Sequence, residues 1–404
     1  MRKKISVEEA QELLLNFARK KETEEVSLIH SMNRVLARNI YANISIPPFD
    51  KSPLDGYALR GEDTENASNE NPVVLRITEE ISAGKVPAYK VVPGTAAKIL
   101  TGAPIPEGAN SVIRYEDTQW DDEYVRISNP VMPRENVIYE GEEIQKNNII
   151  LEEGTLITSA VMGMMASQGI NICKVYKKPS VAVITTGSEL TDVGQQLSYG
   201  KIYNSNLYTV SGYVRSLGLE CMEVGNVEDN LDNIADKISE ALKTADIVIT
   251  TGGASVGDYD YAISSLEKIG AEILFWKVQM KPGMATLAAQ KDGKLILGLS
   301  GNPGSAIIGM MRVVQPYLLK CCGRRDYMPE EINVILKNDV KKKSPSTRLL
   351  RGRLTIDNGR AFFEENAGQG NGMLISLLDF DLIGEIPAGS PPVSGGTMIK
   401  AYRY

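Results

Sequence analysis

The sequence predicts a multidomain α/β protein whose central domain is a doubly wound, mostly parallel sheet. The chain has 404 residues, enough for about two to four domains. Between residues 179 and 326, short apolar strands alternate with amphipathic helices, the pattern of a parallel sheet covered on both faces. Runs of β-forming residues broken by Pro and Gly lie on both sides of this region. We therefore expect smaller β domains beside the central one.

The first region is helical. A capping-box pattern at Ser6 precedes apolar residues at helical spacing, so residues 6–20 are predicted to form an amphipathic helix that precedes Pro47 and Pro48. A helical pattern returns near Ser159–Ser167, in a long uncharged run that we interpret as a buried helix and not as a membrane span. Four domains are predicted: a helical linker domain (residues 1–46 and 141–178), an inserted β domain (47–140), a central α/β domain (179–326) and a C-terminal β-barrel domain (327–404).

The central domain follows a regular order of strand, loop and helix. Each predicted helix places its apolar residues on one face, as the helix at residues 231–243 does with Leu231, Ile234, Ile238 and Leu242. The predicted strands are residues 181–184, 219–224, 246–250, 273–278 and 295–299, and the predicted helices are residues 207–217, 231–243, 261–269 and 305–319.

Composition excludes several function classes. A formal charge of −7 argues against a general nucleic-acid binder, which needs a basic face. The single histidine, His30, excludes a metal site with two His ligands, and any Ser-His-Asp triad would have to use it. The four cysteines form no C-x-x-C pair and no targeting segment is visible, so we expect a reducing, cytoplasmic location. We interpret His30 and the run Met162, Met164 and Met165 as packing residues.

Three glycine-containing loops follow predicted strands of the central domain, at residues 185–190, 250–260 and 300–305. In an open α/β sheet, ligands bind outside the carboxyl ends of the strands, and glycines let backbone N–H groups approach a phosphate. Neither G-x-x-x-x-G-K-[ST] nor G-x-G-x-x-G occurs, which disfavours an ordinary nucleoside triphosphatase or a Rossmann dehydrogenase. Ordinary tight turns are the alternative. Because three such loops meet on one predicted edge, we favour an anion site.

Carboxylates accompany these loops. Glu189, Asp229, Asp258 and Asp260 supply oxygen ligands of the kind that Mg²⁺ prefers. The alternative for Asp229 is an N-cap of the next helix, and Asp258 and Asp260 could cap the helix that follows them. Both interpretations remain open at this point.

Lys277 and Lys281 lie near the end of another predicted strand and could neutralise a phosphate or an oxyanion, although solvated lysines are the alternative. Asp55 and Thr101 lie in Pro- and Gly-rich stretches that are typical of turns, and their residue chemistry alone does not mark a site.

These segments, in this order, resemble the molybdopterin molybdenumtransferase family, which includes bacterial MoeA proteins and the C-terminal domain of gephyrin. The resemblance covers nearly the whole chain. The matching stretches are PPFDKSPLDGYA (47–58), TGAPIPEG (101–108), TTGSEL (185–190), IYNSN (202–206), TGGASVGDYDY (251–261), FWKVQMKPG (275–283) and GNPGSA (301–306).

The resemblance implies an elongated homodimer with its active site between subunits. It implies insertion of molybdate into adenylylated molybdopterin with release of AMP, aided by a divalent cation such as Mg²⁺, and encounters with a molybdopterin adenylyltransferase and acceptor molybdoenzymes. The catalytic residues that it implies are Asp55, Glu189, Asp260, Lys277 and Lys281, and the metal ligands are Glu189, Asp229 and Asp260. The implied substrate-binding residues are Thr101, Glu143, Thr186, Gly187, Ser188, Asn206, Asp229, Gly252, Gly253, Ser255, Asp258, Gly301, Asn302, Ser305, Arg351 and Ser376.

The chain departs from the family pattern at a few positions. Ile138 stands where Arg is common, Glu143 where Asp is frequent, and Asn371 and Gly372 lie near the place of a usual Ser. These changes leave the choice between molybdate and tungstate open. Two other functions also remain open: a pterin-binding scaffold without turnover, and a nucleotide enzyme similar to molybdopterin adenylyltransferase on the same α/β domain.

Overall fold

The computed structural model describes residues 1–252, 259–343 and 345–404, and for Tyr259 and Asp260 the backbone only. The chain divides into two compact units. The first comprises residues 1–38, 153–162 and 172–404, and the second comprises residues 39–152 and 163–171. Among the described residues, none of the helices combines the length and the apolar character needed to cross a membrane.

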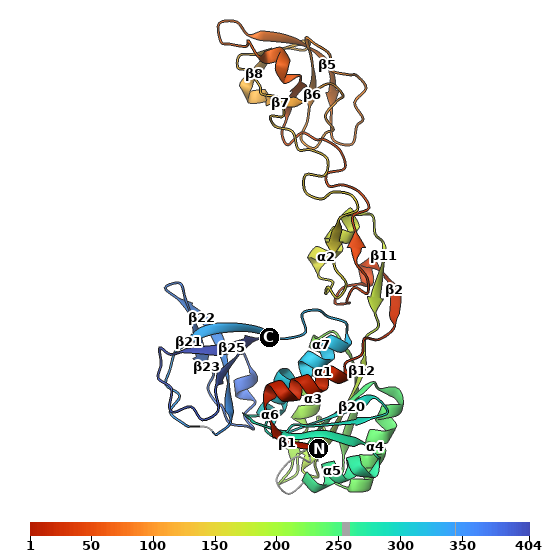
Figure 1. The fold of residues 1–404 in the computed structure, drawn as a ribbon, viewed down its shortest axis with the longest axis vertical. Helices are drawn as coiled ribbons and strands as arrows, with labels where there is room; N and C mark the ends of the chain where they lie inside the picture. The colour runs from red at the N-terminus through yellow and green to blue at the C-terminus, as the bar shows by residue number, and fades with distance from the viewer. Residues whose placement is uncertain (253–258, 344) are drawn as a thin grey trace. The chain divides into compact units, whose positions relative to one another are not determined.

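A seven-stranded sheet forms the centre of the first unit (Figure 1). All neighbouring pairs are parallel except the two that involve β19, which confirms the predicted mostly parallel α/β sheet. In spatial order the strands are β1 (Arg2–Ile5), β17 (Glu272–Val278), β19 (Leu287–Lys291), β20 (Lys294–Leu299), β16 (Ile247–Thr251), β12 (Ser180–Thr186) and β15 (Glu220–Val227).

Helices cover both faces of this sheet, as the alternating pattern predicts. On one face, α1 (Val7–Phe17), α3 (Ser205–Ser216), α6 (Pro303–Gly309) and α7 (Gln315–Cys321) contribute to one large apolar core. On the other face, α4 (Leu231–Thr244) and α5 (Tyr259–Lys268) pack against the sheet in a second core. Burying apolar surface on both sides explains the near-continuous hydrophobic runs of the central strands.

Three features of this sheet were not predicted. Arg2–Ile5 forms an edge strand and α1 packs on the sheet, whereas we expected both segments in the linker domain. The strand β19 was also missed because its sequence, LAAQK, has weak β propensity. The single helix predicted over residues 305–319 is instead α6 and α7 joined by a π-helical turn, Met310–Val314. Arg2, Lys3 and Lys4 make up most of β1, and charged residues are common in edge strands. The strand therefore lacks the apolar pattern from which strands are predicted.

The C-terminal region is a closed barrel, as predicted. The pairing of β22 with both β23 and β24 closes the ring, and Leu350, Phe363 and Leu382 fill its centre. Leu349 and Ile383 belong instead to the core of the α/β domain, so the barrel packs directly on that domain. The strands are β18 (Met280–Lys281), β22 (Thr347–Asp357), β23 (Arg360–Glu365), β21 (Glu330–Leu336), β25 (Met398–Arg403) and β24 (Leu382–Ile386).

The second unit contains the inserted β domain. Its six-stranded sheet buries Tyr57, Leu75, Val125 and Ile127 on one side and Ala58, among others, on the other. In spatial order the strands are β7 (Ser111–Arg114), β4 (Gly56–Leu59), β6 (Thr95–Ile99), β5 (Val73–Ile81), β9 (Tyr124–Ile127) and β8 (Thr118–Trp120).

Short elements complete the chain. Two-stranded pairs are β3 (Ile40–Tyr41) with β10 (Ile149–Leu151), β2 (Thr23–Ser27) with β11 (Ile172–Tyr176), and β13 (Leu190–Thr191) with β14 (Ile202–Tyr203). The 3-10 turns are η1 (Leu28–His30), η2 (Gly61–Thr64), η3 (Tyr115–Asp117) and η5 (Ile375–Leu377).

Two packing predictions are wrong. The helix α2 (Ser159–Ser167) exists, but only Met165 is buried, while Met162 and Met164 are half-buried. Its uncharged sequence is rich in Ser, Gly and Ala, and such small residues are tolerated at a surface as well as in a core. His30 is exposed at the end of η1 and packs in no core.

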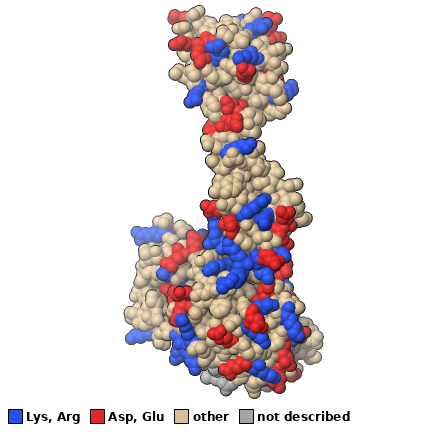
Figure 2. Space-filling model, turned by 45° about the vertical axis from the view of Figure 1, so that its right-hand side comes forward, with Lys and Arg blue, Asp and Glu red and all other residues tan. Residues whose placement is uncertain are grey.

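Lys and Arg gather where β2 and β11 approach the α/β domain (Figure 2). Ion pairs account for several of the basic residues in this part of the first unit. Lys20 pairs with Glu153, Lys177 with Glu22, and Arg324 with Asp326. These ion pairs offset part of the positive charge of the basic group.

Candidate active site

The three glycine loops begin side by side at one edge of the sheet. Thr185 of β12 lies opposite Thr251 of β16, and Thr251 lies opposite Leu299 of β20. Because these strands are parallel and end at this level, the loops that follow them leave from the same edge. This is the edge at which open α/β sheets bind ligands.

Glycine makes the close approach of these loops possible. The φ angle of Gly252 is +102°, and a Cβ atom there would lie 1.9 Å from the carbonyl oxygen of Thr186. A Cβ on Gly301 would lie 3.4 Å from the Cα of Gly252. A larger residue at position 252 would therefore separate the first loop from the second.

Asn206 fastens two of the loops together. From the start of α3, its amide nitrogen donates to the Thr251 hydroxyl at 3.0 Å and to the Gly301 carbonyl at 2.8 Å. Its amide oxygen is buried and has no hydrogen-bond partner among the described residues, and the same holds for the Thr186 hydroxyl. Buried polar atoms are normally paired, so these two atoms are available to a ligand or a bound water molecule.

The first loop is held by Asn226, near the end of β15, and by Asp229, which follows that strand. Asp229 accepts a hydrogen bond from the backbone N–H of Ser188 at 2.9 Å, and Asn226 donates to the Gly187 carbonyl at 3.2 Å. The helix α4 is capped by Asn230, whose side chain accepts from the N–H groups of residues 232 and 233. The capping role considered for Asp229 is therefore wrong, and its carboxylate connects two loops of the edge. Glu189 is exposed on the same loop.

Lys277 lies at the same edge, farther along the sheet. The strand β17 runs in the direction of β20 with β19 between them, so the carboxyl ends of β17 and β20 are separated by about 10 Å. Lys277 adopts a φ of +65°, and its ammonium lies 3.9 Å from the centre of the Trp276 ring. Lys281 follows in β18, where it pairs with β22 of the barrel and is exposed.

The barrel reaches the third loop through Arg351 and Asn371. Arg351 is fully buried, and its guanidinium donates to the carbonyl of Gly370 at 3.2 Å and approaches that of Gly304 at 3.5 Å. Burial lowers the pKa of Arg351 and also raises the pKa of Glu365. The Asn371 carbonyl accepts from the N–H of Ser305 at 3.2 Å. These contacts place a buried cation directly beneath the loop.

Other predicted residues have different surroundings. Ser376 is buried, and its hydroxyl donates to the Met373 carbonyl at 3.0 Å, so it is occupied within its own turn. Asn302 is exposed at the start of α6. Gly253, Ser255 and Asp258 lie outside the described residues. The backbone of Asp260 belongs to the first turn of α5, but its side chain is not described.

Glu189 and Asp229, the two predicted metal ligands whose side chains the structure describes, do not by themselves form a closed cage. Within residues 1–252, 259–343 and 345–404, no three Asp, Glu, Cys or His side chains gather closely enough to hold a metal ion. Glu189 and Asp229 nevertheless supply carboxylates from neighbouring loops, and Mg²⁺ commonly uses only one or two protein carboxylates together with water and substrate phosphates. The donor chemistry therefore fits Mg²⁺ when a phosphate-bearing substrate completes its shell.

The second unit carries Asp55 and Thr101 as a pair. One oxygen of the Asp55 carboxylate accepts both the backbone N–H and the hydroxyl of Thr101, each at 2.7 Å. These bonds, the backbone one first, lower the pKa of Asp55. Both side chains are exposed, as is Glu143, whose N–H donates to the Ile46 carbonyl. A carboxylate kept ionised on an exposed turn is consistent with a role outside its own domain.

Sequence reasoning missed Asn226 and Lys201, which support the first loop. Lys201 donates its ammonium to the Ser188 carbonyl. Asn226 has a detectable signal, because a polar residue near the carboxyl end of a parallel strand lies at the edge where such sheets bind ligands. Lys201 has none, since it lies in a polar stretch between two short strands.

Known proteins are similar to this chain over nearly its whole length. Family models match the MoeA N-terminal region (domains I and II) at residues 5–169, a probable molybdopterin binding domain at 182–320 and the MoeA C-terminal region (domain IV) at 333–404. A molybdopterin molybdenumtransferase of Staphylococcus aureus (strain Mu50 / ATCC 700699) is 37% identical over 395 residues, which cover 98% of this chain and 94% of that protein. The chain belongs to the MoeA family.

Further relatives agree with this assignment. A molybdopterin molybdenumtransferase of Staphylococcus epidermidis (strain ATCC 35984) is 35% identical over 98% of this chain and 94% of its own length. The crystal structure of a molybdopterin biosynthesis MoeA protein from Pyrococcus horikoshii OT3 is 30% identical, covers 99% of this chain and 100% of its own, and superposes with a TM-score of 0.85. The MoeA fold, with its linker, inserted, α/β and barrel regions, is thus shared over the full length.

Proposed function

We propose that this MoeA protein inserts molybdate into adenylylated molybdopterin and releases AMP. As a member of the family it is a transferase of molybdenum cofactor biosynthesis. This proposal rests on two buried atoms at the three glycine loops, the Asn206 amide oxygen and the Thr186 hydroxyl, which have no hydrogen-bond partner among the described residues. A pterin nucleotide offers N–H donors and phosphate oxygens to such an edge.

In this proposal the basic residues bind the anionic groups, and the acidic residues bind the cation or the polar groups of the substrate. Lys277 and Lys281 supply ammonium groups that would hold oxyanion or phosphate charge, which is most valuable where negative charge develops during bond cleavage. Arg351, buried under the third loop, adds a fixed positive field from the barrel side. Glu189, Asp229 and Asp260 would hold Mg²⁺ or the polar groups of pterin and ribose. Bound Mg²⁺ would neutralise phosphate charge as the adenylate leaves.

We also propose that the protein works as a homodimer. Asp55 and Thr101 form an exposed, hydrogen-bonded pair in a unit separate from the loops, so a second copy could receive them. Mixing Asp55→Ala subunits with Lys281→Ala subunits tests this arrangement. Partial recovery of activity in the mixture is expected if each site uses both subunits, whereas no recovery would contradict a shared site.

The deciding experiment supplies the purified protein with adenylylated molybdopterin, Mg²⁺ and molybdate, and follows AMP and the metallated cofactor. Asp260→Asn and Lys281→Ala are each expected to slow AMP release about 100-fold, because each substitution removes a side-chain charge that would lie beside the reacting groups of the substrate. Asp232→Asn and Lys341→Ala, exposed residues of like charge, are the matched controls. Unchanged AMP release in both test variants would remove their assignments.

The same experiment separates the other two functions. Pterin binding without AMP release would identify a scaffold. ATP-dependent adenylylation of molybdopterin would identify a nucleotide enzyme on the same α/β domain. Replacing molybdate by tungstate in parallel reactions measures the oxyanion preference that Ile138, Glu143 and Asn371 leave open.

A further inference from the structure

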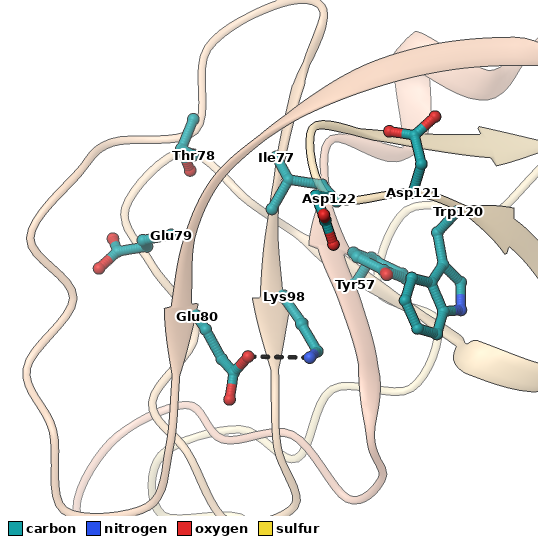
Figure 3. Close-up of a pocket in the computed structure, with 9 residues that line it drawn as sticks. All are labelled: Tyr57, Ile77, Thr78, Glu79, Glu80, Lys98, Trp120, Asp121 and Asp122. Atoms are coloured by element: carbon teal, nitrogen blue, oxygen red, sulfur yellow. Dashed lines mark ion pairs between the residues drawn. The ribbon is translucent and has the colours of Figure 1, made fainter.

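The inserted β domain carries a pocket whose lining includes none of the residues assigned to the reaction. The cavity has a volume of about 320 Å³, the size of a small ligand site. It opens between strand β5 and the turn that joins β8 to β9 (Figure 3). All of its lining residues belong to one unit, so the pocket is complete within the inserted domain.

A β-bulge shapes one wall of this pocket. Along β5 and β6, Ile77 pairs with Ala96 but Glu80 pairs with Lys98, so one extra residue is accommodated in β5. Bulges redirect side chains and are frequent next to binding sites. Both Glu79 and Glu80 line the pocket, and Glu80 lies beside Lys98 while the Glu79 side chain points away from Lys98 (Figure 3).

The lining is strongly acidic. The lining includes Glu79, Glu80, Asp121 and Asp122 and a single cation, Lys98, so its formal charge is four negatives and one positive, or −3. Arg126, outside the lining, pairs with Asp121 at 3.2 Å. Glu80 pairs with Lys98 at 2.8 Å. Asp122 is exposed and forms no hydrogen bond or ion pair with any residue that the structure describes. This charge repels anions and attracts cations.

Existing hydrogen bonds keep two of these carboxylates in place. Glu79 accepts from the backbone N–H groups of Ala88 and Tyr89, and Asp121 accepts from those of residues 123 and 124. Backbone bonds to Asp121 lower the pKa of its carboxyl. The backbone therefore holds Glu79 and Asp121 in place, whereas Glu80 is held by the Lys98 side chain.

A buried hydroxyl also lacks a partner in this pocket. The Tyr57 side chain is fully buried, and its hydroxyl has no hydrogen-bond partner among the described residues. Burial raises the pKa of Tyr57, and the charges of Glu80 and Asp121 raise it further. Tyr57 lines the pocket together with these two carboxylates. A bound N–H donor would satisfy this oxygen.

Aromatic rings provide a second kind of attraction for a cation. Trp120 is 53% exposed, so much of its ring is free to contact a ligand. The ammonium of Lys98 lies 5.8 Å from the Trp120 ring and 5.7 Å from the Tyr115 ring, which shows that this cluster already accommodates one cation. A metal ion is a poor fit, because no three of the described carboxylates are close enough to chelate one.

We propose that this pocket binds an organic cation, a protonated alkylamine or a guanidinium group. Carboxylates pair with its charge, the Tyr57 hydroxyl accepts one of its N–H groups, and Trp120 contacts its apolar stem or its charged face. The same chemistry is offered by a free diamine and by a Lys or Arg side chain of another protein. The proposal is independent of the transferase reaction.

Fluorescence of Trp120 tests the proposal in the full-length chain. The Trp276→Phe variant leaves Trp120 as the remaining tryptophan, because the sequence has two. Putrescine and N-acetyl-arginine amide are expected to change its emission saturably, with dissociation constants of about 1 mM. N-acetyl-norleucine amide, which has a similar stem and no charge, should not. The cation that binds more tightly identifies the source, a free diamine or a peptide side chain.

Variants decide whether the pocket itself is responsible. Asp122→Asn is expected to weaken binding about fivefold, and Glu80→Gln by a similar factor, because each removes one charge. Trp120→Leu, followed by calorimetry, should weaken binding about fivefold. Glu70→Gln, an exposed carboxylate outside the lining, is the control. The proposal is overturned if neither cation gives a saturable change up to about 10 mM, if the neutral amide binds equally well, or if Asp122→Asn and Glu80→Gln bind like the control.

Discussion

Acidic side chains have different structural roles at the sheet edge and in the inserted β domain. At the edge, Asp229 accepts from the backbone N–H of Ser188, 41 residues earlier in the chain, and Asn206 joins two further loops. In the inserted domain, Asp55 meets Thr101 on an exposed turn, with no core around the pair. Asp229 and Asn206 therefore connect loops of the fold, whereas the Asp55–Thr101 pair lies on its surface.

This difference has a consequence for mutation. At the edge, structure and ligand binding depend on the same buried contacts, so a change there should reduce both. On the exposed turn, chemistry can change while stability does not.

The largest effect is expected for Gly252→Ala. The new Cβ would lie 1.9 Å from the Thr186 carbonyl oxygen at a φ of +102°, so the first and second loops must separate. The free energy of unfolding should fall by about 3 kcal/mol, with loss of pterin binding. Urea denaturation measures the first and a binding titration the second.

Gly270→Ala provides the matched control. Its φ is +72°, but nothing lies within 4 Å of a Cβ there, so only the backbone conformation opposes the substitution. The cost should be about 1 kcal/mol, with pterin binding unchanged. Equal losses in the two variants would show that backbone strain, and not the contact between loops, determines the result.

Asn206→Ala should have the next largest effect. It removes the hydrogen bonds to Thr251 and Gly301 and leaves the Gly301 carbonyl unsatisfied. We expect a loss of about 2 kcal/mol in the free energy of unfolding and a weaker pterin complex. The exposed Asn233→Ala should stay within about 0.5 kcal/mol of the parent protein. A stable Asn206→Ala protein with full affinity would contradict the role of this bridge.

Asp229→Asn removes a negative charge from the same edge while keeping the size and shape of the side chain. The amide oxygen can still accept from the Ser188 N–H, so the unfolding free energy should fall by only about 1 kcal/mol. Turnover should fall about tenfold because the charge is lost. The neighbouring Asn230→Ala, which removes the cap of α4, should cost about 1 kcal/mol without affecting turnover. If Asn230→Ala lowered turnover equally, Asp229 would act only through the helix.

The edge could be predicted from residue chemistry, while the exposed pair could not. Alternating strands and helices place the loops after β12, β16 and β20 together, because parallel strands share an edge. Asp55 and Thr101 became candidates only through the family resemblance, since Pro- and Gly-rich turns carry acids for many reasons. Burial was predicted least well. His30 and α2 lack the charges that mark a surface, and yet they are largely exposed.

The smallest effect is expected at the exposed pair, for Thr101→Val. The valine keeps the backbone N–H that donates to Asp55 but removes the hydroxyl, so the pKa of Asp55 should rise toward its ordinary value. A carboxyl whose pKa is lowered by folding stabilises the protein above its ordinary pKa, and this contribution disappears as the pH falls through the lowered value. NMR titration of the Asp55 carboxyl carbon measures the shift. Thr78→Val, whose hydroxyl donates to Ala96, should leave it unchanged. An Asp55 pKa that does not move in Thr101→Val would show that the backbone bond alone holds the charge, and the hydroxyl would then be free for a substrate.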